Sequence, residues 1–201
     1  MSSSEYSVYV EHEYLARVLP VILIVVYSST LLFGVSLAVT NPAYAHEVLE
    51  PAIRSIEESP LTKLCQEASK LWFSEKTLEA TLLIVVIGFL RTLSELITAL
   101  LPPYVAFTYF IEGLFIGTSE YMERLFLVMY IPVTVGDLIS ISLIESGLFQ
   151  ILLSKTKNRP LGNISVVLII TGIIGVFVAS YLATISSCII EGILLSHKPG
   201  F

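Results

Sequence analysis

Long apolar runs constrain the fold of this chain more than any other feature of its sequence. A helix that crosses a bilayer needs roughly 20 mostly apolar residues. Five runs approach or exceed that length: 18–40, 78–101, 103–119, 125–154 and 164–196. The sequence therefore predicts an all-α, polytopic membrane helical bundle with five transmembrane helices, forming one integral membrane domain over residues 1–201.

Composition agrees with a membrane location and excludes several classes of protein. Hydrophobic residues make up 55% of the chain and charged residues 14%, whereas soluble proteins carry about 25% charged residues. A net charge of −6 with only 11 Lys and Arg residues excludes a nucleic-acid partner. Cys65 and Cys188 are too few and too far apart in the sequence to predict a disulfide framework or a thiolate metal site.

The first apolar run resembles a secretory signal in two respects, because Arg17 precedes it and a small-residue site, Ala43-Tyr44-Ala45, follows it. The preceding segment is acidic, however, and the run is longer than the roughly 7–15 residues of a signal sequence. We therefore expect a retained helix.

Pro102-Pro103 predicts a hairpin or sharp break between the second and third runs, and Pro132 interrupts the fourth.

The polar segment 41–76 predicts two short amphipathic helices. Asn41-Pro42 and Ser59-Pro60 each combine a capping residue with a proline at the first helical position. Apolar residues then recur at three- and four-residue spacing, and Trp72 suits a membrane interface. Two interpretations stay open: a helical hairpin that caps the bundle, or a lid that binds a partner protein.

The distribution of Lys and Arg favours a cytoplasmic N-terminus in a multi-pass protein of the cell membrane. Arg17 and the compact group Lys155, Lys157 and Arg159 then lie inside. The total count of basic residues favours the opposite orientation, but most of those residues lie in the long segment 41–76, where acidic residues dominate.

Ionisable residues inside the apolar runs are the most informative side chains. They are Arg91, Glu95, Glu112, Asp137, Glu145 and Glu191. A charge facing lipid costs about 2.5–3.5 kcal/mol, so these groups must point into the bundle, pair or titrate. Arg91 and Glu95, four residues apart, predict an intrahelical ion pair, and we expect some of the carboxyl groups to be protonated near neutral pH.

Two interpretations of this buried polar site stay open. It forms a proton relay, an ion site or a groove for a lipid headgroup, or else it only fixes helix packing through hydrogen bonds. Convergence of the six groups on one water-filled cavity would favour transport, and separate pairs would favour a scaffold.

Small residues predict where helices approach closely. Gly113 and Gly117 are four residues apart. A second stripe on the last run consists of Gly175, Ala179, Ala183 and Ser187 and ends at Glu191. Close packing within the bundle is one interpretation, and the seam of a homodimer is the other.

Three stretches resemble the stage II sporulation protein M family. Glu112-Gly113 to Gly117 is similar to an Asn-Gly-x-x-x-Gly element of that family, and Pro132 to Asp137 is similar to Pro-His-Gly-x-x-Glu without its His and Gly. Glu191 matches a late glutamate. The resemblance covers about the last 120 residues and implies an integral membrane protein of about five spans with no established catalytic activity. One family member works with peptidoglycan-remodelling partners.

These observations lead to two functional hypotheses. The first is a non-enzymatic membrane component that forms a homo-oligomer, such as a dimer, or binds a partner through residues 41–76. The alternative is a proton- or ion-coupled transporter or channel that uses the intramembrane carboxylates. The sequence carries no nucleophile elbow, zinc-protease motif or phosphate-binding loop, so we expect no enzymatic activity, no cofactor and no metal site.

Overall fold

The computed structural model describes residues 3–118, 124–156 and 163–196, and within these ranges the chain forms seven α-helices and no strand. The helices are α1 (Ser3–Thr40), α2 (Pro42–Glu57), α3 (Pro60–Phe73), α4 (Thr77–Thr98), α5 (Pro102–Thr118), α6 (Arg124–Thr156) and α7 (Asn163–Ser196). The predicted all-α class is therefore confirmed for the described residues.

The number of membrane-spanning helices differs from the prediction. Within the described residues, four helices contain a segment long and apolar enough to cross a membrane: Arg17–Thr40, Thr77–Thr98, Tyr130–Thr156 and Asn163–Cys188. The prediction of five spans is wrong because α5 has only 17 residues. At 1.5 Å per residue it is about 25 Å long, less than the roughly 30 Å of a hydrocarbon core. The Pro102-Pro103 pair fixes where this short helix begins.

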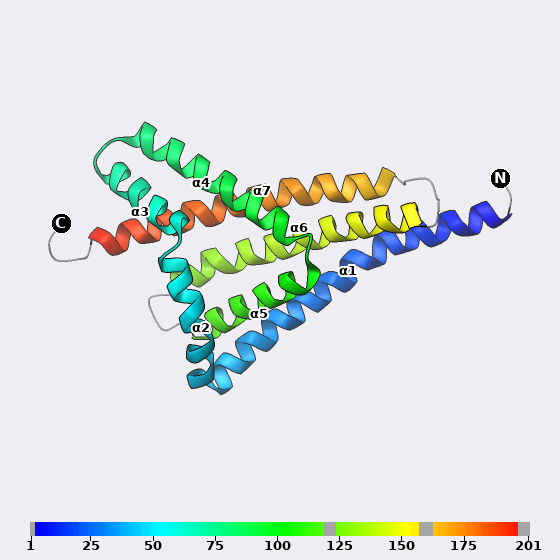
Figure 1. Ribbon diagram of the computed structural model, residues 1–201, viewed down its shortest axis with the longest axis horizontal. Helices are drawn as coiled ribbons and strands as arrows, with labels where there is room; N and C mark the ends of the chain where they lie inside the picture. Colours follow the sequence, from blue (N-terminus) through cyan, green and yellow to red (C-terminus); the bar gives the residue numbers. More distant parts are fainter. Residues whose placement is uncertain (1–2, 119–123, 157–162, 197–201) are drawn as a thin grey trace.

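The long helices α1, α6 and α7 extend along the bundle, with α6 packed along α7 and α1 packed along α5 (Figure 1). Helices α2 and α3 lie at the end of the bundle where α1 finishes. From there α4 runs back into the bundle, and α5 returns beside α1. The start of α1 and the end of α6 lie at the opposite end of the molecule.

Two helices form in the polar segment, with the caps that the sequence predicts. The backbone N–H of Tyr44 donates to the Asn41 side chain at 3.3 Å. The N–H of Thr62 donates to Oγ of Ser59 at 3.2 Å. Each cap satisfies a backbone donor that the first helical turn would leave unpaired. Ala45 of α2 is buried beside α1 and α5, and α3 packs on α4 and α7.

Glycines allow α1 and α5 to approach closely. A Cβ atom at Gly117 would lie 2.7 Å from Cβ of Ala38 and 2.8 Å from the carbonyl oxygen of Val35. A Cβ atom at Gly113 would overlap the Leu31 carbonyl group. Both glycines therefore serve packing inside this chain.

The second stripe of small residues also lies inside the chain. Gly175 faces Ser140 of α6, and Ala179 and Ala183 are buried. Close packing within the bundle therefore accounts for these three positions, and a homodimer stays a prediction.

Candidate functional site

Helix α4 supplies an ion pair at the centre of the candidate site. Nε of Arg91 lies 2.9 Å from Oε1 of Glu95, one helical turn further along α4. The hydroxyl of Ser180, on α7, donates to the other carboxylate oxygen of Glu95. Both oxygens of Glu95 are therefore partnered, and α4 is held to α7 through this residue.

Two further carboxyl groups, from α5 and α6, lie within electrostatic range of the same ion pair. Glu112 interacts with Arg91 and Glu95. Asp137 interacts with Arg91, Glu95 and Glu112. We call these four residues the charge cluster. It contains one basic and three acidic side chains, contributed by the three consecutive helices α4, α5 and α6.

Tyrosines surround the acidic side of the charge cluster. The hydroxyl of Tyr109, on α5, donates to Oδ2 of Asp137 at 3.3 Å. Tyr130, on α6, interacts electrostatically with Glu112 and shares a hydrogen bond with Thr134.

Two oxygen atoms of the charge cluster have no hydrogen-bond partner among the described residues. They are Oε2 of Glu112 and Oδ1 of Asp137, and both are buried. A buried acceptor without a partner costs about 1–3 kcal/mol, and a buried negative charge costs more. Each atom is therefore a place where a bound proton would lower the free energy.

Glu145 is buried apart from the charge cluster. It is only 5% exposed, and one of its oxygens accepts a hydrogen bond from the hydroxyl of Tyr27, on α1. Asp137 and Glu145 are two turns apart on the same side of α6, with buried Ile141 between them. The six charges therefore do not all converge: four lie together and Glu145 is separate.

Glu191 is the sixth predicted residue. It falls within α7, but its side chain lies outside the described residues. The predicted basic residues Lys157 and Arg159 also lie outside them.

Sequence reasoning missed four residues of this site. Tyr27, Tyr109 and Ser180 form hydrogen bonds with the carboxyl groups, and Tyr130 interacts electrostatically with Glu112. A tyrosine in an apolar run reads as an ordinary core or lipid-facing residue, because nothing in the local sequence shows what its hydroxyl contacts. The available signal was weak: a hydroxyl buried in a membrane bundle needs a hydrogen-bond partner, and Tyr27 and Tyr109 are each only 2% exposed.

The geometry of the charge cluster does not suit a metal ion. Among the residues that the structure describes, no three His, Cys, Asp or Glu side chains are grouped closely enough to hold one. The cluster is built around the Arg91 guanidinium, which itself repels cations. The chemistry that the arrangement supports is the uptake and release of protons by carboxyl groups.

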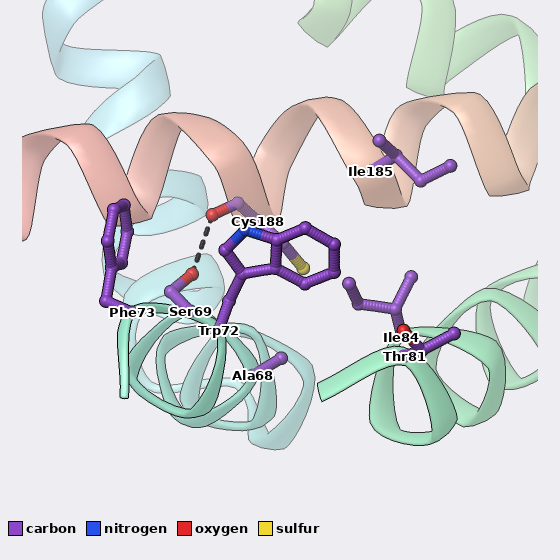
Figure 2. A pocket seen from close by; sticks show the side chains of 8 residues that line it. All are labelled: Ala68, Ser69, Trp72, Phe73, Thr81, Ile84, Ile185 and Cys188. Carbon is purple, nitrogen blue, oxygen red and sulfur yellow. Dashed lines mark hydrogen bonds between the residues drawn. The ribbon is translucent and has the colours of Figure 1, made fainter. Parts of the chain in front are cut away.

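An apolar cavity of about 370 Å³ lies between α3, α4 and α7 (Figure 2). Trp72 and Phe73 of α3, Ile84 of α4 and Ile185 of α7 are among the residues that line it. No residue of the charge cluster belongs to its lining. A water-filled cavity around Glu112 and Asp137 therefore stays a prediction.

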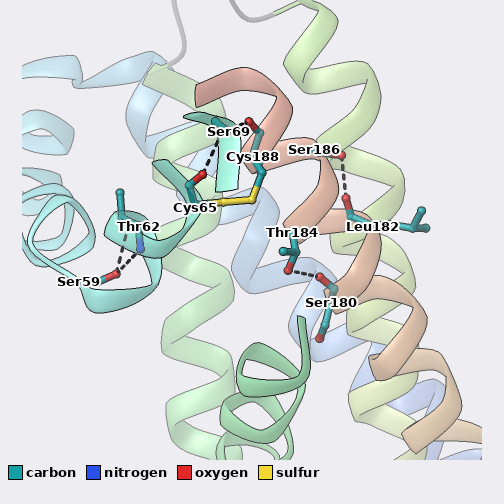
Figure 3. The surroundings of a disulfide bond; sticks show 9 residues. All are labelled: Ser59, Thr62, Cys65, Ser69, Ser180, Leu182, Thr184, Ser186 and Cys188. Atoms are coloured by element: carbon teal, nitrogen blue, oxygen red, sulfur yellow. Dashed lines mark hydrogen bonds between the residues drawn. A yellow bond between two sulfur atoms is a disulfide. The ribbon is translucent and has the colours of Figure 1, made fainter. Parts of the chain in front are cut away.

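A disulfide bond between Cys65 of α3 and Cys188 of α7 adjoins this cavity (Figure 3). The Ser69 hydroxyl donates to the Cys188 carbonyl group at 2.6 Å and contacts the Cys65 carbonyl group at 2.9 Å. The sequence did not predict this single bond, because the cysteines looked too few and too far apart for a disulfide framework. They are 123 residues apart in the sequence, but α3 packs directly on α7.

Comparisons with known proteins do not supply a family for this chain. No protein-family model, curated protein or solved structure matches it. The functional argument therefore rests on the contacts described above, and the resemblance to the stage II sporulation protein M family stays a prediction.

Proposed function

We propose that this chain is a non-enzymatic, multi-pass membrane protein that binds and transfers protons at the charge cluster, as a proton-coupled transporter. One observation carries the proposal: the Arg91 guanidinium pairs with Glu95 and lies within electrostatic range of two more carboxyl groups, Glu112 and Asp137, each of which has a buried oxygen with no hydrogen-bond partner among the described residues. Intramembrane acids of this kind are typical of proton relays.

The charges of the cluster favour proton uptake. With every group ionised, one positive charge would face three negative charges. Removing an ion from water costs several kcal/mol unless a partner compensates it. Glu95 already has Arg91 and Ser180 as partners. Glu112 and Asp137 are therefore the groups at which we expect protons to bind and leave.

Arg91 has a second role in this scheme. When Glu112 or Asp137 releases its proton, the new negative charge lies near a permanent positive charge, because the guanidinium does not lose its proton in proteins. Arg91 thereby makes the deprotonated state accessible without a metal ion.

Proton flux into reconstituted vesicles tests the proposal. The purified protein is placed in liposomes that contain a pH-sensitive dye, and a potassium diffusion potential drives protons inward. We expect a flux above that of empty liposomes, and a reduction of about 100-fold or more in Glu112→Gln and Asp137→Asn. Glu50→Gln is a matched control, because Glu50 is an exposed glutamate whose contact is Arg54 on α2. Wild-type flux equal to that of empty liposomes, or full flux in both cluster variants, would refute the proposal.

The disulfide supports an orientation in the membrane. Disulfides form and persist in oxidising compartments, so we infer that the end of the bundle with α2, α3 and the Cys65–Cys188 bond faces the outside of the cell membrane. The start of α1 and Lys155 of α6 then face the cytoplasm. A membrane-impermeant amine reagent applied to intact cells should label Lys70 on α3 and spare Lys155. Labelling of Lys155 alone would reverse the orientation.

A second candidate function is a membrane component that binds a partner protein through residues 41–76. The observation that favours it is the exposed, charged surface of α2, where Glu50 and Arg54 pair at 2.5 Å. Reversing both charges, with Glu50→Arg and Arg54→Glu, should abolish capture of such a partner and leave proton flux unchanged. Capture that survives the reversal would contradict this candidate.

A further inference from the structure

Glu145 is a buried carboxyl group that the charge cluster does not include. The hydroxyl of Tyr27 donates to its Oε2 atom. Its Oε1 atom is buried and has no hydrogen-bond partner among the described residues. A side chain that is only 5% exposed therefore keeps one oxygen free to bind a ligand.

The titratable groups around this part of α6 leave Glu145 without a compensating positive charge. Tyr27 contacts it from α1, whereas Tyr109 of α5 donates to Asp137 instead. Helix α7 carries Tyr181, whose hydroxyl donates to the Val85 carbonyl group at 3.0 Å. Arg91 and Glu95 of α4 pair with each other. Within the described part of the chain, Glu145 forms no ion pair.

We propose that Glu145 is a second proton-binding site, separate from the charge cluster, and that Tyr27 is its positioning residue. The proposal rests on the proposed proton-transfer function, since it adds a second protonatable group to the same proton pathway. The proton binds at Oε1, which converts the carboxylate into a neutral carboxylic acid. Oε2 meanwhile keeps the hydrogen bond from the tyrosine.

The position of Glu145 along α6 suits a station between the charge cluster and the end of this helix. It lies eight residues beyond Asp137, which corresponds to about 12 Å along a helix. Further along, Gln150 accepts a hydrogen bond from Ser165 at 2.7 Å, and its amide nitrogen is buried without a partner among the described residues. Buried polar groups thus continue from the cluster toward the end of α6 near Lys155.

The transfer step is balanced in atoms and charge. The O–H bond at Asp137 breaks, an O–H bond forms at Oε1 of Glu145, and the negative charge moves in the opposite direction. The two carboxyl groups lie about 12 Å apart along the helix, too far for direct transfer, so this step requires water molecules between them. Glu145 divides the route into two shorter steps.

Infrared difference spectroscopy across a pH range tests the site directly, whether or not the protein transports protons. We expect a carbonyl stretching band of a protonated carboxyl group that disappears in Glu145→Gln. Tyr27→Phe should move this band to higher frequency, because the carbonyl oxygen loses a hydrogen bond. Tyr109→Phe is the matched control. It removes the hydroxyl group that donates a hydrogen bond to Asp137, and it should leave the Glu145 band in place.

Flux measurements test whether the site belongs to the route. Glu145→Gln should lower proton flux about 100-fold while the bands of Glu112 and Asp137 persist. Identical difference spectra for wild type and Glu145→Gln would overturn the site. Full flux in Glu145→Gln would overturn its place on the route. If wild type itself carries no flux, the proposed function fails, and the infrared bands still decide whether Glu145 binds a proton.

Discussion

Tyr27 and Tyr109 pack against each other with their ring centroids 5.6 Å apart, and each donates its hydroxyl hydrogen bond to a different carboxyl group of α6. The pair belongs to the hydrophobic core that α1, α5 and α6 share. The two packed tyrosines therefore connect the hydrogen bonds of Asp137 and Glu145. The position of α1 therefore affects both acids. Its Tyr27 donates to Glu145 directly, and the same ring packs on Tyr109, which donates to Asp137.

Two glycines are expected to respond to the same substitution in opposite ways. Gly117→Ala places a methyl group 2.7 Å from Cβ of Ala38, so we expect a loss of about 1–3 kcal/mol in unfolding free energy from overpacking. Gly136→Ala has no neighbouring atom within 4 Å, and alanine is the better helix former by about 0.5–1 kcal/mol. Thermal unfolding in detergent should therefore show a lower midpoint for the first variant and no decrease for the second. Equal effects would contradict the close approach of α1 and α5.

Removing Arg91 should destabilise the protein through the acid that it leaves behind. In Arg91→Gln, Glu95 loses the partner that lies 2.9 Å away and keeps the hydrogen bond from Ser180. Breaking a buried pair in this way costs roughly 3–5 kcal/mol, and we expect about 3 kcal/mol because Arg91 is partly exposed.

The double variant Arg91→Gln with Glu95→Gln distinguishes this cause from lost packing. It removes both charges together, so it should recover much of the stability lost in Arg91→Gln. Unfolding free energies of the two single variants and the double variant give the coupling between the residues. A double variant as unstable as the sum of the single variants would show that the ion pair carries no coupling.

Breaking the disulfide should lower stability and change the fluorescence of the single tryptophan. A disulfide typically stabilises a protein by about 2–4 kcal/mol, so Cys65→Ser should lower the unfolding free energy by about that amount. Trp72 and Cys188 line the same cavity, and disulfides quench nearby indole rings. Trp72 is the one tryptophan of the chain, so its emission should rise when the bond is reduced.

The serine variant supplies the control for this measurement. Reducing agent should leave the emission of Cys65→Ser unchanged, because no disulfide remains to be broken. A rise of the same size in both proteins would mean that the reagent acts on the tryptophan by another route.

Local features of the fold were predictable from the sequence. Asn41 and Ser59 cap helices where their side chains and the following prolines indicate. Arg91 and Glu95 form the ion pair that their four-residue spacing predicts. In each case the cause lies within one or two helical turns, so the sequence alone contains it.

Relationships between distant segments were not predictable in the same way. The bond between Cys65 and Cys188 depends on how α3 packs on α7. The hydrogen bond between Tyr27 and Glu145 joins residues 118 positions apart. The predicted number of spans was wrong for a different reason. Hydropathy identified the α5 segment correctly as apolar, but the helix begins at Pro102 and is too short to cross a hydrocarbon core.

The Cys65–Cys188 bond closes the chain into a covalent ring that contains α4, α5 and α6. All four residues of the charge cluster belong to this ring. Helix α1 lies outside it and is held against α5 by packing at Gly113 and Gly117. The bond therefore does not restrain α1, and a displacement of α1 would take Tyr27 away from Glu145 without breaking the Arg91–Glu95 pair.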